Sequence, residues 1–240
     1  MDRRAWIDER RAAVIADYDA EAATYDQNPY PNEVQQEWVG RLLATCPPGG
    51  TVLDAPCGTG RYFPLVADSG RRVVGIDQSA GMLEQARARG IAIELQQVGL
   101  QELAFVARFD AVMTVDALEN VAPEDWPLVL ANLHRALRPR GHLYLTVEEQ
   151  AHKHLDAAYA KLVTSGIPAV PGEVVEGDVA GYHYYPHRQQ VLAWLHCENL
   201  ELIDEHYKQE EGWGYRHFLL RSPCPAPADH TAPHPHHASR

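Results

Sequence analysis

Short apolar segments, each bounded by glycine, aspartate or polar residues, recur between residues 51 and 148 of the chain. Segments of this length and composition are typical of strands that are buried in a sheet. We therefore predict five strands, at Thr51–Asp54, Arg72–Asp77, Ile91–Val98, Phe109–Val115 and His142–Glu148.

Between these segments the apolar residues recur at three- and four-residue spacing, as in Leu130, Leu133 and Leu137. This spacing places them on one face of a helix. It predicts helices at Arg61–Ser69, Ser79–Arg89 and Glu124–Leu137. Alternating strands and helices indicate a Rossmann-like α/β fold, with a mostly parallel sheet, helices on both faces and ligands at the carboxyl ends of the strands.

The pattern changes after Glu148. We expect a helix at Gln150–Thr164, a Gly/Pro/Tyr-rich loop at Gly166–Pro186, a helix at Arg188–Cys197, and a hairpin formed by Leu200–Gln209 and Gly212–Arg221. Residues 222–240 are rich in Pro, Ala and His and carry almost no large apolar residue, so we expect a disordered tail. An unstructured tail fixes no ligand geometry for its histidines, and we predict no metal site.

Composition limits the class of protein. A chain of 240 residues with 45% hydrophobic content can bury one sizeable core. A nucleic-acid-binding protein typically carries clustered positive charge. This chain has a net charge of −12, and its Lys and Arg residues are scattered along the sequence, so we expect no nucleic-acid partner. The four cysteines form no C-x-x-C pair, and no apolar run reaches the roughly 18 residues of a spanning helix. We expect a cytoplasmic protein with a small-molecule partner and no membrane contact.

A glycine turn beside an aspartate follows the first strand, in the stretch VLDAPCGTGRY. Asp54 ends the strand, and Gly58 and Gly60 allow a sharp turn close to a ligand. A carboxylate at this point repels a pyrophosphate but attracts an ammonium group. Asp77 ends the second strand, 17 positions after Gly60, where a carboxylate can bind both ribose hydroxyls. An amino-acid-bearing nucleoside, S-adenosylmethionine, meets both demands.

Four motifs together resemble the class I S-adenosylmethionine-dependent methyltransferases: VLDAPCGTGRY, VVGIDQSAGML, FDAVMTVDALENV and LRPRGHLYLTVE. The resemblance covers about Tyr18 to Arg221. It implies a seven-stranded sheet whose antiparallel last strand lies between strands five and six, which the terminal hairpin fits. It also implies methyl transfer to an O, N or C atom of a small molecule. The expected organisation is N-terminal helices and a cofactor lid over residues 1–46, and a methyltransferase core over 47–221 with an insert at about 150–186.

The resemblance also implies positions that contact the cofactor. The methionine end would meet Asp54, Ala55, Gly58 and, from the N-terminal segment YDAEAATYD, Tyr25. Ribose and adenine would meet Asp77, Gln78, Met82 and Leu100, and the end of the fourth strand would contribute Val115 and Asp116. Met82 could equally fill the core.

Two departures from the family pattern concern the same cofactor. Pro56 replaces a glycine of the loop and lacks a backbone donor, so the ligand's carboxylate must find another partner. Val98 and Gly99 stand where many members carry Gly-Asp, so the carboxylate that would meet the adenine amino group is absent.

The residues that would act on the methyl acceptor are predicted from their positions in the expected fold. The rim of strand ends, lid and aromatic loop contains Glu148, His183 and His187, and His183 is our leading general base because imidazole titrates near neutrality. Glu119 and Asn120 would either face the transferred methyl group or shape the turn. We expect His152 to lie on a solvent-facing surface without a catalytic role.

Two other functions share this fold class. A protein that binds S-adenosylmethionine without transferring methyl is the main alternative. A nicotinamide-dependent oxidoreductase is disfavoured by Asp54 and by the terminal hairpin. The acceptor molecule and the oligomeric state are left open.

Overall fold

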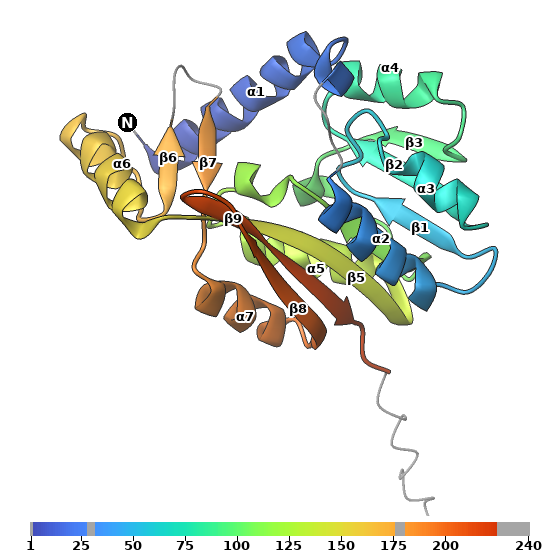
Figure 1. Cartoon of the computed structure of the whole chain (residues 1–240). Coiled ribbons are helices and arrows are strands. Elements are labelled where there is room, and N and C mark those ends of the chain that lie inside the picture. The colour runs from blue at the N-terminus through green and yellow to red at the C-terminus, as the bar shows by residue number, and fades with distance from the viewer. Residues whose placement is uncertain (1, 28–31, 176–180, 225–240) are drawn as a thin grey trace, which may run out of the picture.

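The computed structural model describes residues 2–27, 32–175 and 181–224. Its main feature is a seven-stranded sheet in the order β3-β2-β1-β4-β5-β9-β8 (Figure 1). The strands are β1 (Thr51–Asp54), β2 (Arg72–Asp77), β3 (Glu94–Gln97), β4 (Phe109–Thr114), β5 (Leu137–Gln150), β8 (Glu201–Gln209) and β9 (Trp213–Arg221). The first five run parallel, and β9 lies antiparallel between β5 and β8. The predicted sheet and its antiparallel C-terminal strand are confirmed.

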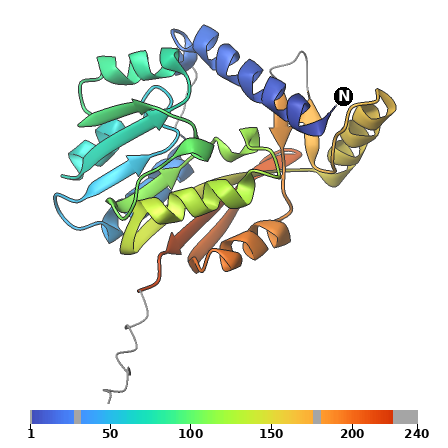
Figure 2. The same ribbon diagram turned by 180° about the vertical axis from the view of Figure 1, so that it is seen from behind.

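Helices cover both faces of the sheet, as predicted (Figures 1 and 2). On one face, α2 (Glu33–Thr45), α3 (Phe63–Asp68) and α4 (Ala80–Ala88) contribute apolar side chains to one core cluster. On the other face, α5 (Trp126–Ala136) and α7 (Arg188–Cys197) contribute to a second cluster. The Trp126 and Trp194 rings stack at 5.1 Å between these two helices.

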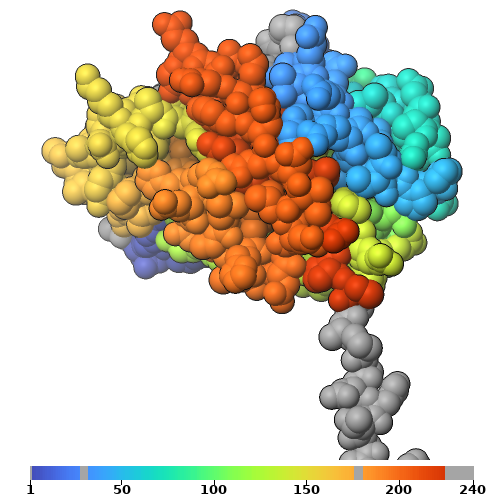
Figure 3. All heavy atoms as spheres, turned by 60° about the horizontal axis from the view of Figure 1, so that its bottom comes forward, coloured from blue at the N-terminus to red at the C-terminus, as the bar shows by residue number. Residues whose placement is uncertain are grey.

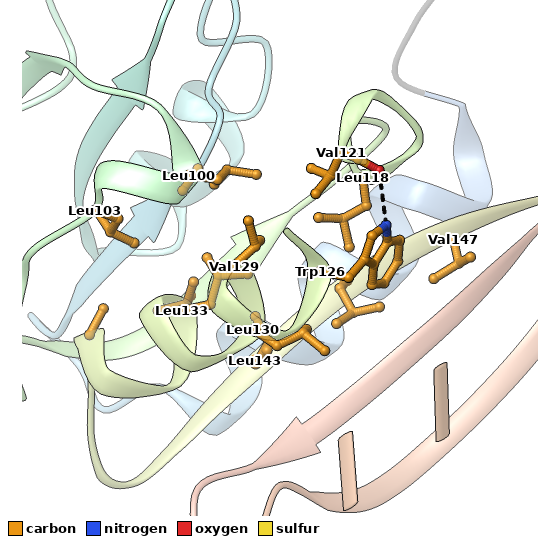
Figure 4. Close-up of a cluster of buried hydrophobic side chains, with 14 of the residues drawn as sticks. Leu100, Leu103, Leu118, Val121, Trp126, Val129, Leu130, Leu133, Leu143 and Val147 are labelled. Carbon is orange, nitrogen blue, oxygen red and sulfur yellow. Dashed lines mark hydrogen bonds between the residues drawn. The ribbon is translucent and has the colours of Figure 1, made fainter. Parts of the chain in front are cut away.

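The core on the second face also holds the turn that follows β4. Trp126 is fully buried, and its indole N–H donates a hydrogen bond of 3.2 Å to the Val121 carbonyl (Figure 4). Leu118 and Val121 point into the same apolar cluster. Because packed apolar side chains adopt few positions, this anchoring fixes the backbone of residues 115–121.

The insert differs from the prediction. Within the predicted loop Gly166–Pro186, β6 (Glu173–Val175) and β7 (Tyr182–Tyr184) form a separate antiparallel pair beside α6 (His152–Thr164). The alternation of buried Tyr182 and Tyr184 with half-buried His183 is a strand pattern, and packing against the rest of the molecule makes it a strand. Residues 176–180 of the predicted loop lie outside the described residues.

Some boundaries also differ. β3 spans Glu94–Gln97, where the prediction was Ile91–Val98. β5 begins at Leu137 instead of His142, so α5 passes directly into the strand. Ser222, predicted to begin the tail, is buried and donates its N–H to the Gly141 carbonyl at 2.8 Å. The rest of the predicted disordered tail, from residue 225, lies outside the described residues.

The N-terminal helix α1 (Arg3–Glu21) runs from the β6–β7 pair to α4 (Figures 1 and 2). At its start, Arg3 forms a bidentate pair with buried Glu173 at 2.8 Å on both arms. At its end, Asp19 accepts from the Ser79 hydroxyl at 2.6 Å and from the Gly81 N–H at 2.8 Å. Both ends of α1 are therefore attached to the core. Within the described part of the chain, no helix combines the length and apolarity needed to cross a membrane.

Candidate functional site

The glycine loop after β1 is joined to both neighbouring strands. The N–H groups of Ala55 and Cys57 donate to the carbonyls of Met113 and Ile76, at 3.0 and 2.7 Å. Gly58 has a φ of +50°, which favours glycine because it has no Cβ. The loop thus has the turn geometry that the sequence predicted, and it is held rigidly at the carboxyl edge of the sheet.

Asp77 fixes this loop as well as facing the pocket. One carboxylate oxygen accepts from the Gly58 N–H at 2.9 Å, and the other accepts from the Ser79 N–H at 2.8 Å. Burial raises the pKa of Asp77, although these backbone hydrogen bonds oppose the shift. The two carboxylate oxygens together have four acceptor positions, more than these backbone donors occupy, so acceptor capacity remains for a ligand hydroxyl.

Asp54 is 1% exposed, and within the described part of the chain its Oδ2 atom has no hydrogen-bond partner. Burial, and secondarily the charge of Asp77, raise its pKa well above the ordinary range. A buried carboxyl group without a partner is costly unless a cation or donor reaches it. This orphaned atom therefore fits the predicted ammonium group, reached directly or through water.

A pocket opens beside Asp77. Most of the residues predicted to contact the cofactor line it: Tyr25, Gly58, Asp77, Gln78, Met82, Leu100, Val115 and Asp116. Asp54 and Ala55 do not line it, because both are buried behind the loop. The fold therefore brings eight of the ten predicted cofactor residues together around one space.

The pocket also contains residues that the sequence reasoning missed. Arg11 and Tyr18 come from α1, and Arg61 and Tyr62 come from the segment just after the glycine loop. The Arg61 guanidinium lies 4.3 Å from the centre of the Tyr25 ring and donates to Asp26 at 2.8 Å. Arg11 and Tyr18 are seven positions apart, a spacing that puts them on one helix face and could have identified them.

Gly99 lies against the ends of two side chains. A Cβ atom at this position would lie 2.5 Å from Nη2 of Arg11 and 2.7 Å from Oε2 of Glu102. Arg11 pairs with Glu102 in this place. A guanidinium from α1 thus lies where the family pattern would place an aspartate.

Carboxylates gather at the end of β4. Asp116 has a φ of +58°, an uncommon value for a residue other than glycine that is often found at functional sites. Its N–H donates to the Thr146 hydroxyl at 2.7 Å, and its Oδ1 accepts from the Tyr215 hydroxyl. Burial raises the pKa of Asp116 to about 6, and the charge of Arg61 opposes this shift.

Glu119 lies next to this group in the short helix η3 (Leu118–Asn120). It is 8% exposed, and its Oε2 atom has no hydrogen-bond partner among the described residues. Burial raises its pKa well above the ordinary range, and the charges of Asp116 and Glu148 raise it further. The sequence left open whether Glu119 shapes the turn or faces the ligand.

The three predicted acid–base residues do not line the pocket. Glu148 accepts from the Gln150 side chain at 2.7 Å, and its charge acts on Glu119. His183 is on β7, with its ring stacked on Tyr185 at 5.9 Å. His187 borders a second hollow, which is also lined by Glu149 and Leu155. In that hollow the His187 ring lies 5.0 Å from the ring of exposed His152. The catalytic role of these residues stays a prediction.

Comparison with known proteins assigns this arrangement to a family. A sequence model described as a methyltransferase domain matches residues 52–141. Demethylmenaquinone methyltransferase of Renibacterium salmoninarum is 30% identical over 205 residues, which cover 82% of this chain and 84% of that protein. Malonyl-[acyl-carrier protein] O-methyltransferase of Serratia marcescens is 31% identical over 138 residues, covering 55% and 51%. The chain spans about half the length of this and several other curated relatives.

A solved structure shares the fold. The 1,6-didemethyltoxoflavin-N1-methyltransferase of Burkholderia thailandensis, crystallised with 1,6-didemethyltoxoflavin and S-adenosylhomocysteine, aligns with a TM-score of 0.67. The alignment covers 93% of this chain and 91% of that one, at 18% sequence identity. At such low identity the similarity shows a common fold.

Proposed function

Because the chain belongs to the class I S-adenosylmethionine-dependent methyltransferases, we propose that it transfers a methyl group from S-adenosylmethionine to an O, N or C atom of a small-molecule acceptor. The observation that carries the proposal is the pocket in which Asp77, held by the Gly58 amide, faces the same space as Met82 and Leu100. The relatives are named for acceptors of different kinds, a quinone precursor and a malonyl thioester, so their names fix no acceptor for this chain.

The residues present fit S-adenosylmethionine. Asp77 has acceptor capacity for a ribose hydroxyl, and the orphaned oxygen of Asp54 fits the ammonium group. Pro56 supplies no N–H donor, but the Arg61 guanidinium lines the same pocket and can bind the carboxylate. Gln78, Met82 and Leu100 would contact the adenosine.

The bound cofactor supplies an electrophilic methyl group on a sulfonium, so the protein mainly has to align the acceptor and exclude water. Tyr18 of α1 and Tyr25 line the pocket on the side of the N-terminal segment, which supports its proposed role as a lid. A general base is needed only for a hydroxyl or a protonated amine. For that role we retain His183, Glu148 and His187 as proposals, although none of the three lines the pocket.

The test is the release of S-adenosylhomocysteine. Purified protein is incubated with methyl-labelled S-adenosylmethionine and pooled small metabolites, and labelled products are separated by mass. We expect a labelled small-molecule product. Binding of S-adenosylhomocysteine in calorimetry without any labelled product would favour the non-methylating alternative. Co-purification of a nicotinamide nucleotide would contradict the proposal.

A further inference from the structure

The short helix η1 (Tyr25–Gln27) is attached to the cofactor loop through Asp26. The Oδ1 atom of Asp26 accepts from the Thr59 hydroxyl at 2.6 Å and from Nε of Arg61 at 2.8 Å. The Oδ2 atom accepts from Nη2 of Arg89 at 2.5 Å. Thr59 belongs to the loop, Arg61 follows it, and Arg89 is the C-cap of α4. One carboxylate therefore joins three residues that are distant from it in sequence.

Two guanidinium groups surround this carboxylate. Besides pairing with Asp26, Arg89 donates from Nε to the Thr59 carbonyl at 2.6 Å. Burial raises the pKa of Asp26, but the hydrogen bonds from Thr59 and Arg61 and the charge of Arg89 lower it by more, so the carboxyl group is ionised at neutral pH. Two positive charges thus meet one negative charge, and one positive charge remains in excess.

Arg61 presents part of its guanidinium to the pocket. Its hydrogen bonds within the described residues use Nε, which donates to Asp26, and Nη2, which donates to the Tyr25 carbonyl. None of these bonds uses Nη1. The side chain lines the pocket, and its charge acts on Asp116 and Tyr62, which line the same pocket. N–H donors of Arg61 are therefore available to a ligand, while the Nε edge is held by Asp26.

A carboxylate is the ligand group that this guanidinium fits. S-adenosylmethionine carries one at its methionine end, and Pro56 offers it no N–H donor. Among the described residues that line the pocket, the cations are Arg11 and Arg61. Arg11 is paired with Glu102 beside Gly99, where the adenosine is expected. Arg61 follows the glycine loop directly, so it is the cation for the methionine end.

The orientation of Arg61 matters for this contact. A long side chain loses rotamer freedom when it is ordered, and a ligand that has to order it binds more weakly. The bonds to Asp26 and to the Tyr25 carbonyl order the guanidinium without the ligand, and its planar fork then has one direction. Asp26 itself does not line the pocket. It can act on the ligand through the residues that it holds, or through its charge.

We propose that Asp26 is a positioning residue for the cofactor: it orients Arg61 so that the guanidinium binds the carboxylate of S-adenosylmethionine. This inference rests on the proposed function, because it concerns the same pocket. It goes further by giving a residue outside the pocket control over the recognition of one ligand group.

Two other roles of Asp26 lead to different results. If Asp26 acted only as a counter-charge to Arg61, its removal would strengthen the binding of a carboxylate. If it only tied η1 to the loop, its removal would weaken all ligands of the pocket to the same extent. A positioning role weakens only the ligands that carry the carboxylate.

Two matched ligands separate these cases. S-adenosylhomocysteine is compared with 5′-deoxy-5′-(3-aminopropylthio)adenosine, which keeps the adenosine, the thioether and the ammonium group and lacks only the carboxylate. Calorimetry on the full chain measures both Kd values. In the wild type we expect S-adenosylhomocysteine to bind at least about 10-fold more tightly. In Arg61→Gln this ratio should fall to about threefold or less, because the charged donor is lost.

Asp26→Ala removes both acceptor oxygens. It should weaken S-adenosylhomocysteine by about 3- to 10-fold and leave the Kd of the analogue within about twofold of the wild type. Added to Arg61→Gln, it should weaken S-adenosylhomocysteine by no more than about a further twofold, because Asp26 acts through Arg61. Asp26→Asn, which keeps one acceptor oxygen, should have a smaller effect in the same direction and provides a second reading if Asp26→Ala does not fold.

The controls concern folding and charge. The Asp26 side chain is 45% exposed, so its loss should lower the Tm by no more than about 4 °C. Asp17→Asn removes an exposed carboxylate from α1 and should leave both Kd values unchanged.

The outcomes also separate the two proposals. If S-adenosylhomocysteine does not bind the wild-type chain, the proposed function fails. If it binds, the inference about Asp26 alone is overturned by any of three results: a wild type that binds both ligands equally, an Asp26→Ala variant that keeps the wild-type ratio, or one that binds S-adenosylhomocysteine more tightly than the wild type does.

Discussion

Asp77 combines two tasks, one in the geometry of the loop and one in the pocket. As the last residue of β2 it accepts the Ser79 N–H and so shapes the start of α4, and it also holds the Gly58 amide of the cofactor loop. Its remaining lone pairs face the pocket. One carboxylate thus joins loop geometry to ligand binding.

Asp77→Asn should weaken S-adenosylhomocysteine binding by about 1.5–3 kcal/mol, because an amide presents one acceptor oxygen where the carboxylate presents two. Calorimetry on the folded variant measures the change. Gln96→Glu, an exposed substitution on the neighbouring strand β3, serves as the control and should leave binding unchanged. An affinity for Asp77→Asn within twofold of the wild type would contradict the assignment of Asp77 to the ribose.

His217 is a second residue whose surroundings determine its pKa. It is 1% exposed, shares a hydrogen bond of 2.9 Å with the Tyr144 hydroxyl, and stacks on Trp38 at 5.5 Å. Its Nε2 has no partner among the described residues. Burial, aided by His206, lowers the pKa of His217 to about 4.

The stability of the protein should therefore fall as pH decreases from about 6.5 to about 4. In this window the unfolded chain binds a proton at His217 and the native chain does not, so protons favour unfolding, by up to about 3 kcal/mol. Urea denaturation at a series of pH values measures the slope. His217→Phe should reduce this slope, whereas His196→Gln, at an exposed histidine, should keep it. An unchanged slope in His217→Phe would show that the imidazole is not responsible.

At the scale of elements, α1 connects parts of the molecule that are distant in sequence. Arg3 pairs with Glu173 of β6, which is 0% exposed and also accepts from the Tyr182 hydroxyl at 2.8 Å. Asp19 binds the start of α4. Arg11 and Tyr18 lie on α1 between Arg3 and Asp19, and both line the pocket. The attachment of the two helix ends therefore positions part of the cofactor site.

Arg3→Gln should destabilise the protein by about 3 kcal/mol, because it leaves the buried Glu173 carboxylate without its cation. It should also speed hydrogen exchange in α1 and weaken S-adenosylhomocysteine binding. Arg4→Gln is the matched control, because Arg4 is mostly exposed, and it should change stability by no more than about 0.5 kcal/mol. Equal effects of the two substitutions would show that the Arg3–Glu173 pair does not hold the helix.

At the scale of the whole molecule, the pocket is lined by residues between Arg11 and Val121 and is supported by a contact from the C-terminal part of the described chain. Its walls come from α1, the β1 loop, the ends of β2 and β4, and the segment around Leu100, while Tyr215 of β9 supports Asp116 from the far end. In Figure 3, α2 lies beside the C-terminal strands, and the Arg41–Asp204 pair joins them. A ligand in this pocket would contact α1, the β1 loop and the segments that follow β2 and β4.

Binding should consequently stabilise the protein as one unit. S-adenosylhomocysteine at about 100 times its Kd should add about 2.7 kcal/mol to the free energy of unfolding, if it binds only the native state. Thermal scans at increasing ligand concentration should show one transition that moves upward. A transition that splits, with α1 melting at an unchanged temperature, would show that α1 takes no part in binding.

The sequence by itself determined the features that depend on local pattern. The parallel strands, the crossover helices and the terminal hairpin follow from hydrophobic periodicity and turn residues, and Asp54, Gly58 and Asp77 follow from a short motif at strand ends. The tertiary structure decided what depends on long-range packing. It turned part of a Gly/Pro/Tyr-rich loop into the β6–β7 pair, and it placed Arg11 where Gly99 leaves room. It separated His187 from the pocket and left Glu119 buried without a partner. The Arg11–Glu102 pair joins residues 91 positions apart, and no local pattern in a single sequence records which distant side chain will be the neighbour.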